Sequence, residues 1–449
     1  MILETDEGVE GIGIGSHADV ARLFPALEGE DPRAVSSLFD RMLAQVFKSG
    51  HAGATYGGVA TLDAALWDLK AKLAGEPLWR LLGGRDRFVP GYASGLDIAL
   101  DDGELSAFYE DFADRGYVAG KLKGGVDPVA DLRRLRLLHG VLGRNTPSPG
   151  LMLDANESWQ VKQAVRYVAA IESEIDLLWV EEPLRRWDAL GHARLSAAVR
   201  AAVATGENLT GVDQFRPLFD AGAPDIVQAG AIWGVTHVLR LAHAANARNL
   251  PVSPVGYNTN PAVAAAMTAV PNHLTTEVQA LHWAHGMSVD QEFADGGIVL
   301  GDEVGSGISI DETAIVDAGR GWADPAGPHM RPSRAGLRVV LDGIETPRDR
   351  HSTTDTSGRR VTTDTARPTL HYNLWSSHDI AADGRRPAGA SGMVGQCCPG
   401  APGRRNDGHA GRSSLGPGRG RAVARARDCR WCPGPEWRVR DGERYHRVG

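Results

Sequence analysis

The amino-acid sequence predicts an α/β fold, a (β/α)8 barrel of the TIM type with an α+β capping domain. Short apolar runs alternate with helical patterns over much of the chain up to residue 342. Counted from Lys123, three of these runs end on acidic residues at steps of 31, 27 and 26 residues. A (β/α)8 barrel uses roughly 31 residues per βα unit, so this repeat is typical of such a barrel.

The first predicted domain, residues 1–88, is the capping domain. Residues 2–15 alternate between apolar and polar side chains and turn at Asp6-Glu7-Gly8, which predicts a β-hairpin. Helical patterns follow over residues 31–47 and 61–82. A hairpin followed by helices predicts an α+β domain in front of the barrel.

The barrel is predicted over residues 89–294. We expect its first strand at residues 89–95, and a helix over residues 103–115 leads to the strand that carries two lysines. Further strands are predicted at residues 225–228, 252–255 and 274–278. These three would be the sixth, seventh and eighth strands, which complete the ring.

Two of the six lysines of the chain, Lys121 and Lys123, lie two residues apart. Side chains alternate faces along a strand, so both amines would point into one pocket. The alternative is that both side chains extend along an edge strand toward water. A closed barrel has no such edge, so the pattern favours a pocket that contains two amines.

Three acidic residues, Asp154, Glu181 and Glu207, end short apolar runs that precede helical patterns. The chemistry of (β/α)8 barrels collects at the C-terminal ends of the strands, so we expect the three carboxylates at one rim. A single acid at a strand end is more often a helix N-cap or a solvated loop charge. Recurrence at the barrel period favours a shared site, and oxygen-only ligands at this density favour Mg²⁺.

These motifs resemble the mandelate racemase and muconate lactonizing branch of the enolase superfamily. The resemblance covers residues 1–342, and its most specific part is the run from Ala64 to Gly84. The other matching stretches are Lys-x-Lys at 121–123, Asp-Ala-Asn at 154–156, Trp-Val-Glu-Glu-Pro at 179–183 and Gly-Glu-Asn at 206–208. The resemblance implies that Asp154, Glu181 and Glu207 bind magnesium and that Lys123 is the catalytic base.

The resemblance also extends to the boundaries of the cap. It implies that residues 295–342 return to complete the cap. In the family, the cap begins with a further strand and a loop that closes over the substrate. The resemblance implies that this chain starts within the second strand, without that first strand and lid loop.

The expected reaction is abstraction of the proton α to a carboxylate, for which enolase-superfamily sites use a Lys or His base with Mg²⁺. Lys121 and the metal are expected to lower the pKa of Lys123 by charge repulsion, and Lys121 is also expected to contact the substrate carboxylate. Further substrate-binding candidates are Asn156, Tyr257 and Glu277. Tyr257 is also a candidate acid, as are His282 and His285 after the eighth strand.

The second acid or base of the family is not visible in the sequence. In the racemase branch it is usually an Asp-His pair from strands six and seven, and in the lactonizing branch a Lys on strand six. This chain has Gln228-Ala229-Gly230 and Ser253-Pro254-Val255 at the corresponding places. A dehydratase needs fewer groups, because one lysine can remove the α-proton and then protonate the departing β-hydroxyl.

The sequence therefore predicts a magnesium-dependent lyase, an acid-sugar dehydratase that gives a 2-keto-3-deoxy acid. One alternative is a racemase, epimerase or cycloisomerase of the same superfamily. Another is an inactive carboxylate-binding pseudoenzyme. The expected partner is a small carboxylate substrate, and the resemblance implies a homo-oligomer.

Composition excludes several other classes of protein. Residues 343–449 hold 19 Arg against 11 acidic residues, so the overall charge of −8 leaves about −16 for residues 1–342, which argues against nucleic-acid binding there. No apolar run reaches the roughly 18 residues of a membrane span. The acidic start lacks the features of a secretory signal, so a cytoplasmic enzyme is expected.

The last predicted segment, residues 343–449, is a low-complexity tail without helical or strand periodicity, which we expect to be disordered. It contains all four cysteines of the chain. Cys429 and Cys432 have the spacing of half a zinc site, but the adjacent Cys397 and Cys398 are poor tetrahedral partners. The tail therefore gives little support for a zinc site.

Overall fold

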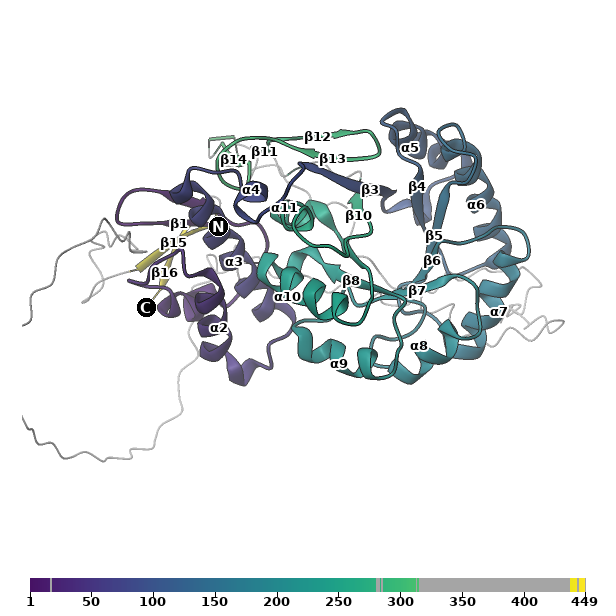
Figure 1. The fold of residues 1–449 in the computed structure, drawn as a ribbon, viewed down its shortest axis with the longest axis horizontal. Coiled ribbons are helices and arrows are strands. Elements are labelled where there is room, and N and C mark those ends of the chain that lie inside the picture. The colour runs from purple at the N-terminus through teal and green to yellow at the C-terminus, as the bar shows by residue number, and fades with distance from the viewer. Residues whose placement is uncertain are drawn as a thin grey trace, which may run out of the picture. The chain divides into compact units, whose positions relative to one another are not determined.

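Eight parallel strands close into a barrel in the computed structural model of the chain (Figure 1). The structure describes residues 1–16, 18–279, 283, 286–311 and 313–314, and the backbone of 437–441 and 444–448. The barrel strands are β3 (Phe88–Ser94), β4 (Ala119–Lys123), β5 (Gly150–Asp154), β6 (Trp179–Glu181), β7 (Ala202–Thr205), β8 (Ile226–Gly230), β9 (Val252–Val255) and β10 (Thr276–Gln279).

Successive strands pair in parallel from β3 to β9, and β10 pairs with β3. The ring closes where His273, just before β10, bridges to Val252 of β9. The predicted barrel is therefore confirmed.

Helices cover the outside of the barrel, and Figure 1 shows α5 to α8 following one another around strands β4 to β7. The start of α5 is fixed by a reciprocal capping box in which Asp101 and Glu104 each accept a backbone N–H of the other. The barrel helices are α5 (Asp102–Asp114), α6 (Pro128–Leu142), α7 (Val161–Glu172), α8 (Ala189–Ser196), α9 (Val212–Asp220), α10 (Val235–Asn246) and α11 (Ala262–Met267).

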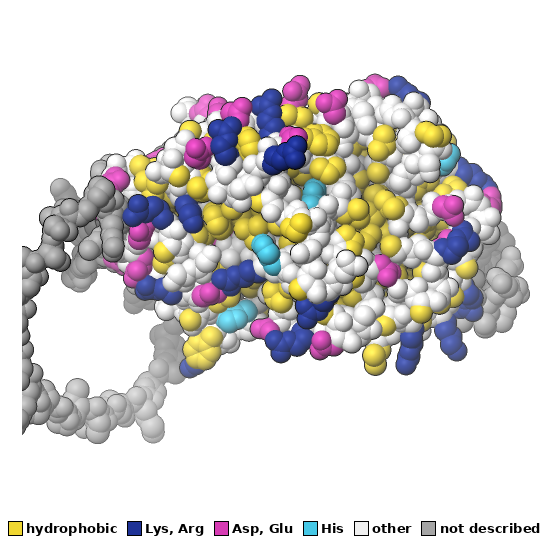
Figure 2. Space-filling view, in the orientation of Figure 1, with side chains coloured by type: hydrophobic (Ala, Val, Ile, Leu, Met, Phe, Trp, Pro, Cys, Tyr) yellow, Lys and Arg dark blue, Asp and Glu magenta, His cyan; other side chains and the backbone are white. Residues whose placement is uncertain are grey.

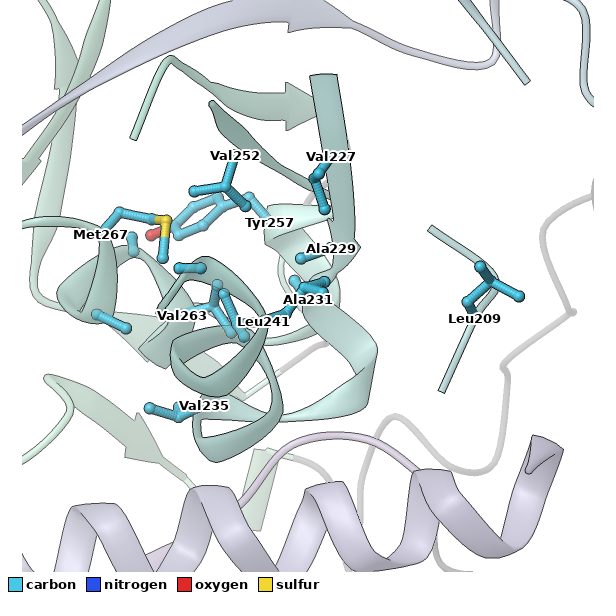
Figure 3. Packing of buried hydrophobic residues seen from close by; sticks show 14 of the residues in the cluster. Leu209, Val227, Ala229, Ala231, Val235, Leu241, Val252, Tyr257, Val263 and Met267 are labelled. Atoms are coloured by element: carbon cyan, nitrogen blue, oxygen red, sulfur yellow. The ribbon is translucent and has the colours of Figure 1, made fainter. Parts of the chain in front are cut away.

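Alternate strand residues face the helices and the barrel interior. Outward-facing apolar side chains such as Val227, Ala229 and Val252 pack against α10 and α11 (Figure 3). A separate buried layer fills the barrel interior and consists of Tyr92, Met152, Trp179, Ala204 and Ile226. Because this layer is fully packed, the polar side chains above it meet at one end of the barrel.

The cap contains the hairpin β1 (Ile2–Glu4) and β2 (Glu10–Ile12) and the helices α1 (Val20–Leu23), α2 (Val35–Gln45), α3 (Gly53–Ala74) and α4 (Leu78–Leu81). The prediction of one helical run over residues 61–82 is wrong in two respects. The helix begins earlier, at Gly53, and it ends before Gly75, which has a left-handed φ of 69°. Glycine tolerates that conformation, and Pro77 cannot continue the helix.

The segment after the barrel returns to the cap. Strands β12 (Gln291–Ala294) and β13 (Gly297–Leu300) form a hairpin that pairs with β3, and β11 (Met287–Val289) pairs with β14 (Ile308–Ile310). The predicted boundary between residues 294 and 295 therefore falls inside a hairpin. Beyond it, Gly305 bridges to Pro77 beside α4.

The buried carboxylate of Asp68 on α3 joins three parts of the cap. One oxygen accepts the backbone N–H of Ile12 at 2.8 Å and lies 2.8 Å from Lys72 Nζ. The other accepts the backbone N–H and the hydroxyl of Ser306 at 2.6 and 2.9 Å. A single side chain thus holds the hairpin and the returning segment on α3.

Replacing Asp68 with Ala is expected to lower the free energy of unfolding by about 2–4 kcal/mol. The change leaves two partly buried backbone N–H groups without an acceptor, and each such loss costs about 1–3 kcal/mol. Urea unfolding measures the effect. Asp176→Ala is the matched control, because that side chain is 92% exposed. Equal losses in the two variants would contradict the role of Asp68.

Helix α3 of the cap also packs against α10 of the barrel through buried polar contacts. The carboxylate of Asp63 accepts the backbone N–H of Thr236 at 2.8 Å and its hydroxyl at 2.5 Å. The indole of Trp67 donates to the same hydroxyl at 2.9 Å. Tyr56 Oη lies 3.3 Å from Nδ1 of the buried His237. This network fixes the cap on one side of the barrel.

His237 is expected to contribute a loss of stability as the pH falls from about 6.5 to about 4. Burial, and next Arg240, lower the pKa of His237 to about 4. The unfolded chain, with an ordinary pKa near 6.5, binds the proton first as the pH falls, so stability is lost over that window. The full effect is about 3 kcal/mol. Asp63 acts in the opposite sense, because burial raises its pKa to about 7.

The free energy of unfolding measured from pH 7 to pH 4 tests this expectation. His237→Gln should lose less stability on acidification than the parent chain. His139→Gln, a change at an exposed position of α6, should behave like the parent. Parallel curves for the parent chain and His237→Gln would contradict the assignment.

The expectation of a tail without regular structure is wrong for its described residues. Strands β15 (Trp437–Asp441) and β16 (Arg444–Val448) pair with each other, and β15 pairs with β1. Trp, Val and Tyr in these runs favour strands, and Asp-Gly at 441–442 is a strong hairpin signal. Composition averaged over the tail concealed this local pattern. The four cysteines lie outside the described residues.

Basic and acidic side chains are interspersed on the face drawn in Figure 2. Exposed pairs of this kind, such as Arg216 with Asp213, typically contribute less than about 1 kcal/mol each. Stability therefore depends mainly on the buried core. Among the described residues, no helix is long and apolar enough to cross a membrane.

Candidate active site

The proposed base and two of the proposed metal ligands lie side by side on three adjacent strands. In the strand register, Lys123 of β4 pairs with Asp154 of β5, and Asp154 pairs with Glu181 of β6. All three are buried. Glu207 follows the end of β7 and is partly buried at the mouth of the barrel. The barrel period therefore brings the predicted residues to one end of the barrel.

The two lysine ammonium groups contact the buried carboxylates directly. Lys123 Nζ forms an ion pair and hydrogen bond with Asp154. Lys121 Nζ pairs with Glu181, and lies 2.7 Å from Glu277 Oε1 and 3.7 Å from Asp154 Oδ2. The two amines thus occupy one pocket, as the alternation along the strand predicts.

Further hydrogen bonds orient these carboxylates. Glu277 accepts the Ser94 hydroxyl at 2.7 Å and the Gly256 backbone N–H at 2.6 Å. The indole of Trp179 donates to Glu181 at 3.1 Å. Such supporting bonds restrict the rotamers of the acids before a ligand binds.

Asn156 and Asn208 support two of the proposed metal ligands. Asn156 donates to Asp154 from its backbone N–H at 2.8 Å and from its amide at 3.3 Å. The amide of Asn208 donates to Glu207 at 3.0 Å and to Glu182 at 2.9 Å. Asn156 was predicted to bind substrate, and the structure shows it holding a carboxylate in place.

The backbone is strained next to these acids. Asn156, Glu157 and Glu182 adopt left-handed φ values of 41°, 59° and 38°. This conformation costs about 1–3 kcal/mol for a residue with a side chain and persists where surrounding contacts enforce it. Here Arg186 pairs with Glu157 and donates to the carbonyl of Asn208 at 3.1 Å. Strain concentrated beside polar groups is typical of functional sites.

Two residues that the sequence analysis did not identify hold the backbone of Lys123. Asp97 accepts the Lys123 N–H at 2.9 Å. Arg134 donates to the Lys123 carbonyl at 2.9 Å and to the Asp97 carbonyl at 2.6 Å. Asp97 follows the first barrel strand much as the other acids follow theirs, so its position offered a signal. Arg134 lies within a helix and offered none.

The structure does not place Tyr257 among the carboxylates. Its ring lies in the hydrophobic core beside Met267 (Figure 3) and packs edge-on against Trp283 and Phe293. Its hydroxyl is buried without a partner among the described residues. His282 and His285 lie outside the described residues.

Burial and neighbouring charges shift the pKa values of the acids in opposite directions. Burial raises the pKa of Glu181 to about 8; Lys121 lowers it, and other carboxylates raise it further. Burial also raises the pKa of Asp154, but Lys123 and Lys121 outweigh this effect and hold it at about 2. Asp154 therefore stays ionised at ordinary pH values, and Lys121 and Lys123 lower the pKa of Glu277 as well.

The pKa of Lys123 is raised, which differs from the expected lowering. Burial lowers this pKa and the ammonium of Lys121 lowers it too, but Asp154, with Glu207 and Glu277, raises it by more. The prediction considered only the positive charges of Lys121 and the metal. The structure adds a carboxylate in direct contact with the amine.

The donor set fits a divalent cation by charge and chemistry. Four carboxylates gather around two ammonium groups, which leaves two negative charges in excess if all are ionised; they are Asp154, Glu181, Glu207 and Glu277. Glu182 adds a further carboxylate beside Glu207 and Asp154. Buried charge of one sign requires compensation. As they stand, no three described His, Cys, Asp or Glu side chains form a group that could hold an ion. The support for a cation is therefore the charge balance of the site, since the structure does not contain a preformed set of ligands.

A capped (β/α)8 barrel with acids and paired lysines at the C-terminal ends of its strands defines a class of barrel enzymes, and sequence comparisons identify the family. Residues 1–83 match the mandelate racemase / muconate lactonizing enzyme N-terminal domain, and residues 104–314 match the enolase C-terminal domain-like family. The chain belongs to the mandelate racemase and muconate lactonizing enzyme family of the enolase superfamily.

Individual relatives agree with this assignment. A 3,6-anhydro-alpha-L-galactonate cycloisomerase of Streptomyces coelicolor is 30% identical over 325 residues, which are 69% of this chain and 88% of the relative. An L-talarate/galactarate dehydratase of Salmonella typhimurium is 30% identical over 333 residues, which are 70% of this chain and 80% of the relative. The structure of an L-talarate dehydratase of Polaromonas sp. JS666, complexed with Mg and L-glucarate, has a TM-score of 0.63 at 28% identity. The match covers 70% of this chain and 90% of that chain.

Proposed function

We propose that this chain is a magnesium-dependent lyase that dehydrates an acid sugar to a 2-keto-3-deoxy acid. One observation carries the proposal: Lys123 lies level with Asp154 and Glu181 on adjacent strands. A buried amine is thereby held beside the acids proposed to bind the cation. Relatives named as dehydratases of talarate and galactarate, of L-rhamnonate and of arabinonate support the substrate class.

Asp154, Glu181 and Glu207 would hold the Mg²⁺ ion. When bound, the ion supplies a Lewis acid that stabilises negative charge developing on the substrate carboxylate. Lys121, fixed by Glu181 and Glu277, places a second positive charge beside the same position. Both groups make the α-proton of the substrate more acidic.

Lys123 would carry out both proton transfers. The contact with Asp154 raises the pKa of this amine, so the amine would be neutral only when Asp154 is engaged by the cation instead. The neutral amine would then take the α-proton, and the electrons of the C–H bond would form the new carbon–carbon double bond. The bond between the β-carbon and its hydroxyl breaks, and the ammonium of Lys123 protonates the departing oxygen to give water. The enol product then tautomerises to the 2-keto-3-deoxy acid. Asp97 and Arg134 hold the backbone of this lysine in place.

The proposal is tested by incubating the chain and Mg²⁺ with galactarate, L-rhamnonate and arabinonate and measuring 2-keto acid formation. Turnover of at least one of these acid sugars is expected. The proposal is contradicted if none of the three acid sugars gives a product or exchanges its α-hydrogen.

A racemase, epimerase or cycloisomerase is the second candidate, favoured by the cycloisomerase relative and by a similar structure described as a racemase with bound magnesium. Reaction in D2O separates the two. A product that carries deuterium at the α-carbon and keeps its β-substituent indicates the second candidate. Magnesium binding without any exchange indicates instead a carboxylate-binding pseudoenzyme.

We also propose that the enzyme acts in the cytoplasm as a homo-oligomer. The acidic N-terminal residues, which lack the features of a secretory signal, support the compartment. The family resemblance supports the assembly. Light scattering of the purified chain tests the oligomeric state.

A further inference from the structure

The wall of the barrel opposite the lysines is formed by β8 and β9. In the ring of eight strands, β8 lies four strands from β4 and therefore across the barrel from Lys121 and Lys123. Figure 3 shows Val227, Ala229 and Val252 on the side of these strands that packs against helices. The alternate residues, including Gln228 and Ser253, consequently face the barrel interior.

Gln228 is a buried polar side chain without a partner. It is 0% exposed, and neither its amide oxygen nor its amide nitrogen has a hydrogen-bond partner among the described residues. Ser253, its neighbour in the strand register, donates its hydroxyl to the Thr275 carbonyl at 2.8 Å. Buried amides are rarely left unpaired, because an unsatisfied group has lost its hydration without gaining a hydrogen bond.

The next inward position of β8, Gly230, has no room for a side chain. A Cβ atom at Gly230 would overlap the backbone oxygen of Glu207 and lie 2.7 Å from the indole of Trp233. That indole donates to the Glu207 carbonyl at 2.6 Å, so it is fixed in the space. Gly230 pairs in register with Val255 of β9. The inward residues of the two strands are Ile226, Gln228, Gly230, Ser253 and Val255, none of which titrates.

We propose that Gln228 binds a hydroxyl group of the substrate from the wall opposite the lysines and thereby helps to determine which acid sugar is accepted. A carboxamide offers one donor and one acceptor group, which match the acceptor and donor of a hydroxyl. The neutral wall recognises the substrate without proton transfer, and the lysine side performs the chemistry. This inference rests on the proposed function.

A buried water molecule is the other partner that would satisfy the amide. The two explanations differ in what an apolar replacement does. If Gln228 binds substrate, Gln228→Leu removes two unpaired polar atoms and leaves the unfolding midpoint unchanged or higher, while substrate binding weakens. If a structural water bridges Gln228 to the protein, the same change lowers the unfolding midpoint and leaves binding intact.

The experiment measures binding in a chain that cannot turn over. With galactarate, L-rhamnonate and arabinonate as probes and Mg²⁺ present, calorimetry gives the dissociation constants of Lys123→Ala and of Lys123→Ala combined with Gln228→Leu. The added change should weaken binding of the preferred acid on the order of tenfold. Gln45→Leu, at an exposed position of α2, is the matched control and should leave binding unchanged.

Steady-state kinetics of the single variant Gln228→Leu complete the test. A raised KM for the preferred acid and altered relative rates across the three acids are expected. Unchanged dissociation constants and relative rates, in an enzyme whose parent form is active, overturn the inference and leave the proposed function standing. A parent chain that neither turns over nor exchanges the α-hydrogen of any probe overturns both.

Discussion

Replacing Lys123 with Ala should reduce turnover and α-hydrogen exchange by about 10³-fold or more, while magnesium affinity survives. A positioned general base contributes about 10²–10⁴-fold, and here the same amine would serve twice, as base and then as acid. Magnesium affinity should be retained, because the three proposed ligands remain. Removing the amine frees Asp154 from its ion pair, so the affinity would if anything increase.

Turnover of an acid sugar, α-deuterium exchange by NMR and magnesium binding by calorimetry measure these three quantities. Lys162→Ala, a change at an exposed lysine of α7, should alter none of them. Because the Lys123 side chain is buried, thermal unfolding must show that the variant remains folded. A folded Lys123→Ala variant with parent-like exchange would refute the assignment of the base.

The second large effect is expected at the metal. Glu207→Gln should weaken magnesium binding by more than about 100-fold and abolish turnover, since loss of a supporting residue alone typically costs 10–100-fold in affinity. Among the described residues the Glu207 carboxylate forms no ion pair and accepts one hydrogen bond, from Asn208. An isosteric amide at this partly buried position should therefore change stability little.

Titration of Mg²⁺ into the variant measures the affinity, and urea unfolding checks stability. Glu292→Gln on β12 is the matched control, because that side chain is exposed. Parent-like affinity in Glu207→Gln would exclude this carboxylate from the proposed ligand set. It would then direct attention to Glu182, which shares the amide of Asn208.

The barrel and the grouping of its polar residues were predictable because both follow from periodicity. In a ring of parallel strands, residues at corresponding positions of neighbouring strands lie side by side. The register of Lys123 with Asp154 and Glu181 follows from that geometry. The same rule predicted that Lys121 would share the pocket. Glu277 on the eighth strand follows from it as well, since β10 pairs back with β3.

Features that depend on individual side-chain packing were not predictable. Tyr257 follows its strand at a position expected of a catalytic acid, yet its ring packs in the hydrophobic core. The pairing of Lys121 with Glu277 joins residues 156 positions apart, and no sequence pattern specifies it. Likewise, Trp233 in the following turn occupies the space that a side chain at position 230 would need, so glycine is found there. These details depend on three-dimensional packing, which periodicity does not encode.

Crystals grown with Mn²⁺ in place of Mg²⁺ and with an acid sugar that is a substrate would show where the metal and the sugar bind. One anomalous peak is expected, bonded to oxygens of Asp154, Glu181 and Glu207, with Lys123 Nζ facing the α-carbon of the sugar acid and Gln228 on its far side. A peak bound elsewhere, or a fully occupied sugar acid with Lys123 turned away from its α-carbon, would contradict the proposed site.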